Sequence, residues 1–304
     1  MSERASVPKE ESDDADEESA ATQSIETGAD AVAAALENAG VELIFGVQGG
    51  AIMPVYDALY EHDSITHVTM AHEQGAAHAA DAYGIVTGKP GVCMATSGPG
   101  ATNLVTGIAD ASMDSDPLLA LTGQVPTAFV GNDAFQETDT IGVTQPITKY
   151  NIFSEDADTV GDDVGQAWSL AESGRQGPTL VDLPKDVTQT ETDSQVTEPK
   201  TPDTYNPPEE ADEVIVEEAA KTLADADRPL ILAGGGVIKG EASDELRQFA
   251  REYEIPVVQT MPGTGAFPDD DPLSLEIAGM HGTGYGNLAI SNCDVLLGIG
   301  TRFD

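Results

Sequence analysis

The chain has 304 residues, of which 54 are acidic and 13 are basic, so its formal net charge is −41. This length predicts about two domains, and a hydrophobic fraction of 40% excludes a chain that is disordered throughout. A polyanion repels other polyanions, which argues against nucleic acid or an anionic membrane as a direct partner. The acidic excess extends over every segment, which is typical of adaptation to molar salt, where self-repulsion is screened. An unusually acidic protein from an ordinary cytoplasm is the alternative.

The first 26 residues are acidic, low in complexity and almost free of large apolar side chains, so we expect a disordered tail. They are too acidic for a transit peptide and lack the apolar region of a signal peptide. No apolar run of 18 residues occurs, so neither secretion by a signal peptide nor membrane spanning is expected, and a cytoplasmic protein is predicted. Cys93 and Cys293 lack metal-ligand spacing and are predicted to be buried free thiols.

From residue 27 onward, apolar strands alternate with helices. Helical periodicity between Thr27, a suitable N-cap, and Gly40, a suitable stop, predicts the first helix. Residues 27–187 are thus predicted to form a doubly wound parallel sheet covered by helices on both faces. Its strands are predicted over 42–47, 65–70, 91–97, 117–123 and 177–184. Its other helices are predicted over 51–62, 73–88, 101–114 and 162–174.

Residues 188–212 contain four prolines and few bulky apolar residues, which predicts a linker. A second α/β domain is predicted over 213–304. Because three strands make a thin sheet and the sequence stops directly after the last one, we expect this domain to be truncated; a naturally small domain is the alternative. Its strands are predicted over 229–236, 255–261 and 294–300, and its helices over 214–226, 242–253 and 284–293.

A histidine-rich motif opens the predicted helix 73–88. His72 and His78 are six residues apart, about 240° around a helix, so they cannot form the zinc-protease pair, which needs histidines four residues apart. Glu73 lies at the start of this helix directly after a strand. It is either a solvated acid favoured by the helix dipole or a residue of a ligand site at the carboxyl edge of the sheet.

Two glycine-rich turns follow predicted strands, at 97–103 and at Gly234, Gly235 and Gly236. Each lets backbone N–H groups approach a ligand, but each is also compatible with an ordinary tight turn. The loop 123–138 is longer than a usual strand-to-helix connection and is therefore a functional candidate. Basic residues are so scarce that each is a candidate for holding an anionic group.

Several motifs occur together in the order and spacing of one enzyme family. They are HEQGAAHAADAYG, TSGPGATN, GQVP…DAFQET, ITKYN, GRQGPTLVDLPKDV, AGGGV, GMHGT and GTRFD, and they span residues 27–304. The chain resembles the catalytic subunits of the acetolactate synthases, which are thiamine-diphosphate enzymes. The resemblance implies decarboxylation of pyruvate and ligation to a second 2-keto acid, in branched-chain amino acid biosynthesis. It also implies that the carboxyl group of Glu73 bonds the pyrimidine ring of the cofactor and drives its activation.

The resemblance assigns further residues. Phe135, Gln136 and Lys185 match positions along the substrate channel of the family. FAD, which is structural in that family, is expected in a partial Rossmann-like middle domain. For Arg302, one of the residues that match the FAD segments, an ion pair with a nearby aspartate is an equal alternative. The residues matching the FAD segments are Arg175, Gly234, Gly235, Gly236, Gly279, Met280, His281, Gly282, Thr283, Gly300, Thr301, Arg302, Phe303 and Asp304.

The family's GDG…N motif, which binds Mg²⁺ and the diphosphate, does not occur in the sequence. We therefore expect the chain to be an incomplete catalytic subunit, inactive by itself, of an enzyme that is a homodimer or tetramer and that can bind a small regulatory subunit. The alternatives are another thiamine-diphosphate enzyme such as a pyruvate oxidase, a non-catalytic cofactor-binding or assembly module, and an FAD-dependent electron carrier.

Overall fold

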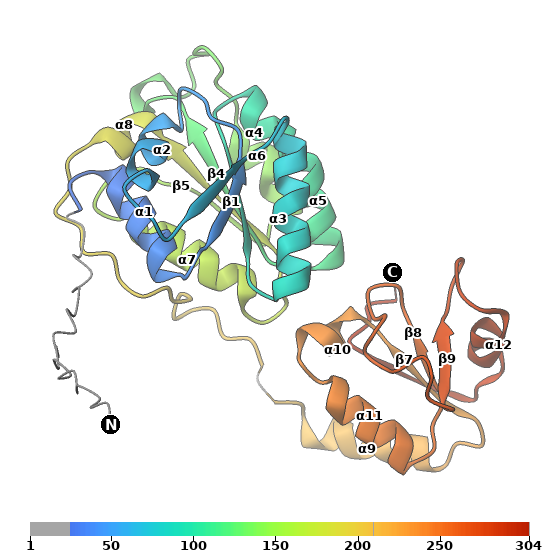
Figure 1. Ribbon diagram of the computed structural model, residues 1–304. Helices are drawn as coiled ribbons and strands as arrows, with labels where there is room; N and C mark the ends of the chain where they lie inside the picture. Colours follow the sequence, from blue (N-terminus) through green and yellow to red (C-terminus); the bar gives the residue numbers. More distant parts are fainter. Residues whose placement is uncertain (1–24, 209, 304) are drawn as a thin grey trace, which may run out of the picture.

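The computed structural model describes residues 25–208 and 210–303, which form two α/β domains (Figure 1). The predicted acidic tail lies outside the described residues except for its last two positions. In the described part, no helix is long and apolar enough to cross a membrane. Both cysteines are free thiols, as predicted; Cys93 is buried, whereas Cys293 is only partly buried, so the expectation of burial holds for one of them.

The first domain contains a six-stranded sheet in the order β2-β1-β3-β4-β6-β5, and all its neighbouring strands are parallel. This confirms the predicted α/β class with a parallel sheet. Its elements are α1 (Gly28–Asn38), β1 (Leu43–Gly46), α2 (Met53–Leu59), β2 (Thr66–Thr69), α3 (Glu73–Thr87), β3 (Gly91–Ala95), α4 (Pro99–Asn103), α5 (Val105–Asp114), β4 (Leu118–Gln124), η1 (Thr127–Phe129), α6 (Thr140–Thr144), η2 (Gln145–Ile147), β5 (Tyr150–Phe153), α7 (Val160–Glu172), β6 (Pro178–Pro184) and α8 (Lys185–Gln189).

Helices cover both faces of this sheet, because successive side chains of each buried strand point to opposite faces. In β4, Leu119 and Leu121 pack in the cluster formed with α1, α2 and α7. Leu118 and Ala120 of the same strand pack in the cluster formed with α3 and α5. Figure 1 shows these two groups of helices on opposite sides of the sheet.

Local signals account for several helix boundaries. Thr27 caps α1 in a capping box with Asp30, and Gly88, with φ of +72°, ends α3 in the left-handed region. The predicted helix over 101–114 is instead two helices that meet at Leu104. The edge strands β5 and β9 were not predicted, because each has only four residues and all of them are partly buried, so neither forms a continuous apolar run.

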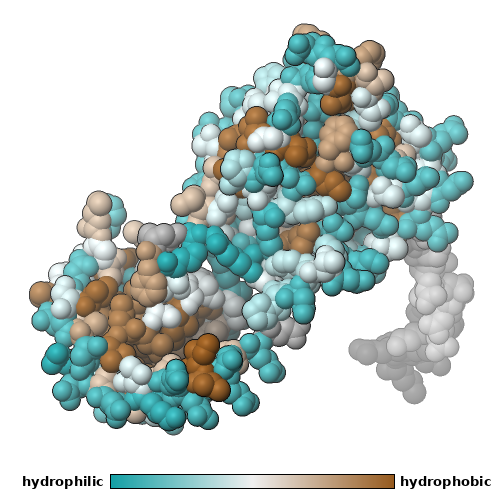
Figure 2. All heavy atoms as spheres, turned by 180° about the vertical axis from the view of Figure 1, so that it is seen from behind, coloured by the Kyte–Doolittle hydropathy of each residue, from teal (hydrophilic) through white to brown (hydrophobic). Residues whose placement is uncertain are grey.

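The second domain contains a parallel four-stranded sheet in the order β10-β7-β8-β9. α11 packs on one face and α12 on the other. α9 has no buried residue, and Figure 2 shows apolar side chains gathered on the surface of this domain. Its elements are α9 (Glu213–Ala224), β7 (Pro229–Ala233), α10 (Gly235–Lys239), α11 (Ser243–Glu252), β8 (Val257–Gln259), β9 (Ser274–Ile277), α12 (Gly284–Asn292) and β10 (Val295–Ile299).

The connection between the domains begins with a short pairing. Thr27 and Glu191 form an antiparallel bridge, supported by backbone hydrogen bonds from Gly28 to Thr190 and from Thr192 to Glu26. The two ends of the first domain therefore lie side by side.

Candidate functional site

The loops that carry the predicted catalytic and channel residues gather at one edge of the first sheet. Because the strands are parallel, their carboxyl ends all meet at this edge, which is where open α/β sheets bind ligands. Glu73 follows β2, residues 97–103 follow β3, the loop 125–139 follows β4, and Lys185 follows β6. The edge thus brings together segments that are more than 100 residues apart in the sequence.

Glu73 is the first residue of α3, and its side chain is fixed at one oxygen. His72 caps the helix, since its Nδ1 accepts a hydrogen bond from the backbone N–H of Gln74 at 3.1 Å. The Nδ2 amide of Asn103, the last residue of α4, donates to Glu73 Oε2 at 3.0 Å. Glu73 Oε1 has no partner among the described residues. The partly buried carboxylate is therefore oriented by Asn103 and keeps one oxygen available to a ligand.

The glycine-rich turn after β3 packs against the backbone of the loop 125–139. Gly98 has φ of +59°, and a Cβ at this position would lie 2.6 Å from the backbone oxygen of Gln136. Only glycine permits this contact, because any side chain would displace the loop. The close packing of this turn at 97–103 therefore fixes the position of the loop at 125–139.

Glu137 organises that loop from within. Its carboxylate accepts hydrogen bonds from the backbone N–H groups of Gly131 and Ala134, and these bonds lower the pKa of Glu137. The neighbouring Phe135 is 87% exposed, and Gln136 is exposed with φ of +58°. The two predicted channel residues therefore lie at the carboxyl edge of the sheet, with the ring of Phe135 uncovered.

Lys185 is the first residue of α8 and is partly buried. Its ammonium group has no hydrogen-bond or ion-pair partner among the described residues. The adjacent Asp186 accepts a hydrogen bond from the backbone N–H of Thr127 at 2.9 Å, which ties α8 to the start of the long loop. A cation without a protein partner is thus held beside the same loop as Phe135.

A separate cavity of about 640 Å³ lies between the two domains. Its volume is within the range of small-molecule and cofactor sites. From the first domain it is lined by the end of α5 and by the turn after α7; from the second domain it is lined by the turns after β7, β8 and β10. Predicted FAD-segment residues that line it are Arg175, Gly234, Gly235, Gly236, Gly300, Thr301 and Arg302.

The lining of this cavity includes three cations and two acids. The cations are Arg175, Lys239 and Arg302, and the acids are Asp114 and Glu172. Arg175 donates from Nε to Ser115 Oγ at 2.9 Å, and its terminal guanidinium nitrogens have no partner among the described residues. An anionic ligand in the cavity would therefore meet at least one unpaired guanidinium edge.

The glycines of the cavity serve packing between turns. A Cβ on Gly234 would lie 2.3 Å from the backbone oxygen of Gly300, and one on Gly236 would lie 2.8 Å from Gly300 Cα. The turn after β7 is thus pressed directly against the turn after β10.

The remaining predicted FAD-segment residues are not brought to the cavity. Met280 is 94% exposed, and Phe303 is 68% exposed. Asp304 lies outside the described residues. Those that do not line the cavity are Gly279, Met280, His281, Gly282, Thr283 and Phe303.

Sequence reasoning missed the contact that joins the two domains. Lys239 Nζ donates to Asp116 Oδ1 at 2.6 Å and to the backbone oxygens of Asp114 and Ser115 at the end of α5. Arg302 donates from Nη2 to the backbone oxygen of Met113. The sequence signal was weak, since Lys239 ends the short helix α10 and Asp116 precedes β4, and neither residue belongs to a motif.

The chain matches two family descriptions. Residues 26–143 match the thiamine pyrophosphate enzyme N-terminal TPP binding domain, and residues 216–304 match the thiamine pyrophosphate enzyme central domain. The first match covers the first domain as far as α6, and the second covers almost all of the second domain.

Similar proteins carry consistent names. The chain is 50% identical over 279 residues to a probable acetolactate synthase large subunit of Methanocaldococcus jannaschii, covering 91% of this chain and 47% of that protein. It is 48% identical over 283 residues to the acetolactate synthase large subunit of Parasynechococcus marenigrum, covering 91% and 46%. It is 47% identical over 279 residues to the acetolactate synthase large subunit of Corynebacterium glutamicum, covering 91% and 44%. The chain thus spans about half the length of the curated relatives it matches.

The catalytic carboxylate predicted from the sequence lies where a parallel α/β sheet binds ligands, and both domains match one family. The chain therefore belongs to the thiamine pyrophosphate enzymes, and within them it is similar to the acetolactate synthase large subunits.

Proposed function

We propose that the chain forms the pyrimidine-binding domain (27–187), a linker (188–212) and a Rossmann-like FAD-binding domain (213–304) of an acetolactate synthase. The proposed reaction is decarboxylation of pyruvate and ligation of the two-carbon unit to a second 2-keto acid, in the biosynthesis of valine, leucine and isoleucine. The names of the relatives support this reaction. The single observation that carries the proposal is Glu73, held by Asn103 at the carboxyl edge of the parallel sheet.

The residues at this edge fit the pyrimidine of thiamine diphosphate. When bound, the cofactor supplies the carbanion chemistry at which a 2-keto acid loses carbon dioxide. Glu73 Oε1 is the oxygen without a protein partner, so it can hold a proton shared with a ring nitrogen while Asn103 fixes the other oxygen. Gly50 and Gly75 have open space where a side chain would project; only Met70 Cε, at 3.6 Å, approaches the Cβ position of Gly75.

The residues at the interdomain cavity fit the anionic part of FAD. Arg175 offers an unpaired guanidinium edge, and Gly234–236 and Gly300–Arg302 complete the wall. For Gly279–Thr283, Phe303 and Asp304 the proposal rests on the resemblance alone. Mg²⁺ is proposed to accompany the diphosphate, with ligands that we do not assign to this chain.

Further features of the proposed enzyme follow from the same family. Phe135, Gln136 and Lys185 are proposed to line the path of pyruvate, whose carboxylate the ammonium group of Lys185 would attract. A cytoplasmic homodimer or tetramer with a small regulatory subunit is proposed, as is adaptation of its acidic surface to molar salt.

The proposal is tested with the native protein, purified from its cells with any polypeptide that accompanies it. Acetolactate formation from pyruvate should fall in Glu73→Gln, because an amide cannot exchange the proton, and should be unchanged in Asp57→Asn, which alters an exposed acid on α2. Equal activity of Glu73→Gln and the native protein would exclude the proposed role.

The flavin part is tested separately by quenching of FAD fluorescence. Arg175→Gln should weaken FAD binding, whereas Lys221→Gln, on the exposed face of α9, should not. Loss of FAD affinity in both variants would show a general charge effect and contradict the assigned cavity.

A further inference from the structure

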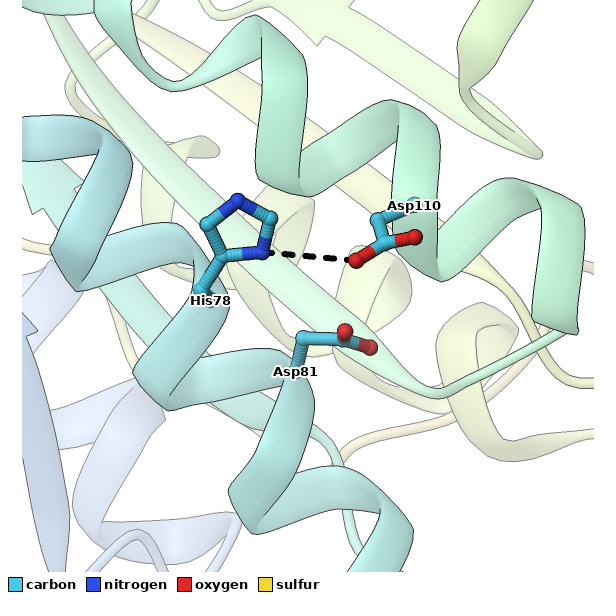
Figure 3. Close-up of side chains that lie close together, drawn as sticks. All are labelled: His78, Asp81 and Asp110. Atoms are coloured by element: carbon cyan, nitrogen blue, oxygen red, sulfur yellow. Dashed lines mark ion pairs between the residues drawn. The ribbon is translucent and has the colours of Figure 1, made fainter.

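A cluster of metal-ligating side chains lies between α3 and α5, apart from both sites described above. His78 and Asp81 are three residues apart on α3 and therefore share one face of the helix, and Asp110 approaches them from α5 (Figure 3). One ligand atom from each of the three lies within 4.8 Å of the other two. His78 Nδ1 is 3.4 Å from Asp110 Oδ2.

The close packing of the two helices holds this cluster together. A Cβ on Gly107 of α5 would lie 2.5 Å from the Cβ of Ala77 of α3. Because only the methyl group of Ala77 lies between the helices at this point, residues one turn further along reach into a shared space. The cluster is therefore set by the backbone of two regular helices, which gives more precise positions than a loop would.

One member of the cluster is buried without a full set of partners. Asp81 is only 7% exposed, and its Oδ1 atom is buried and accepts no hydrogen bond from the described residues. A buried carboxylate oxygen without a donor is costly.

The nearest cation of the second domain does not relieve this deficit. Lys239 Nζ bonds Asp116 Oδ1 and two backbone oxygens, so its donors are used at the end of α5. Asp110 and Asp114 lie near enough to add further negative charge beside Asp81. His78 and Asp110 are partly open to solvent, with 38% and 56% of their side chains exposed, so an ion and its water ligands can reach the cluster.

We propose that His78, Asp81 and Asp110 bind a divalent first-row transition-metal ion, of which Mn²⁺ and Zn²⁺ are the best matches. One imidazole nitrogen and two carboxylate oxygens suit these ions, and water completes the coordination on the exposed side. Mg²⁺ and Ca²⁺ prefer oxygen ligands alone, so the histidine favours a transition metal. The bound ion would join α3, which begins at Glu73, to α5, whose end meets the second domain.

The test measures Mn²⁺ binding by the full 304-residue chain without thiamine diphosphate, using the electron paramagnetic resonance signal of the free ion. The titration is done in about 1 M KCl, where the Debye length is about 3 Å and diffuse binding to the acidic surface is suppressed. We expect one Mn²⁺ per chain, displaced by Zn²⁺. Absence of stoichiometric binding would overturn the proposal.

Variants then assign the ligands. His78→Gln and Asp110→Asn should each weaken Mn²⁺ binding by about tenfold or more, and Asp57→Asn, which removes the same charge elsewhere, should not. Asp81→Asn should abolish binding and raise the unfolding midpoint of the metal-free chain, because it removes the unpartnered buried acid. Equal losses in Asp57→Asn and Asp110→Asn, or unchanged binding in the cluster variants, would contradict the assignment.

Discussion

Lys239 of the second domain lies 2.6 Å from Asp116 of the first, and this ion pair is the most buried of those among the described residues. The carboxylate side chain is 3% exposed and the ammonium side chain 24%. Because the same ammonium group also bonds the last backbone oxygens of α5, it neutralises an acid and completes a helix end at once. This lysine, together with Arg302, which donates to the backbone oxygen of Met113, ties the second domain to the end of α5 at the interdomain cavity.

Removing this lysine should destabilise the protein. Lys239→Met leaves Asp116 buried without its cation, which we expect to lower the free energy of unfolding by about 3 kcal/mol. Chemical denaturation measures the loss, and Lys239→Met with Asp116→Leu should recover part of it. Lys221→Met breaks an exposed pair with Glu217 and should cost less than about 1 kcal/mol. A similar small cost for Lys239→Met would contradict the role assigned to the buried pair.

Asn103 should act on catalysis through Glu73. In Asn103→Ala the Glu73 carboxylate loses its 3.0 Å hydrogen bond and its orientation. We expect kcat for acetolactate formation by the native enzyme to fall by about tenfold to a hundredfold, with little change in the KM for pyruvate. Asn38→Ala, at the exposed end of α1, is the control and should keep full activity. An effect on KM alone would contradict the positioning role.

Gly98 should tolerate no side chain. Gly98→Ala combines a left-handed φ of +59° with a Cβ placed 2.6 Å from the backbone oxygen of Gln136. The strain should cost about 1–3 kcal/mol in unfolding free energy and should increase proteolytic cleavage of the loop 125–139. Gly50→Ala, which meets no atom within 4 Å, is the matched control. Equal protease resistance of the two variants would show that the loop does not depend on its packing against Gly98.

Asp182 should make the stability depend on pH. This residue of β6 is 1% exposed, and burial raises its pKa from the ordinary value of 3.8 to about 7, although Thr122 and Gln124 donate hydrogen bonds to it. The folded state therefore keeps a proton that the unfolded state releases, so the free energy of unfolding should decrease as pH rises from about 4 to about 7. In Asp182→Asn this decrease should be smaller, as measured by urea denaturation across that range. An identical pH slope would show that Asp182 is ionised in the fold.

The sequence predicted the parts of the fold that depend on local pattern. The apolar run at β4 and the caps at Thr27 and Gly88 are visible in the sequence because burial and capping select residue types directly. The strand β5 escaped because it pairs on one side only, so its residues are partly buried and need not be apolar.

The site was predicted in part for a similar reason. Glu73 could be singled out because it opens a helix directly after a parallel strand, and the resemblance to the acetolactate synthases then favoured a ligand-site role over a solvated acid. Asn103 and Lys239 could not, because their roles depend on partners 30 and 123 residues away, respectively, in the sequence. The sequence has no pattern that shows which distant residue a polar side chain contacts, whereas a buried apolar face produces a regular spacing of apolar residues.

The bridge between Thr27 and Glu191 places the points where the chain enters and leaves the first domain next to each other. A force pulling on its two ends would load the few hydrogen bonds of that pairing one after another and would reach the sheet only after they had opened. The same closeness makes the domain a suitable unit for circular permutation, since a short connection could join its ends without crossing the core.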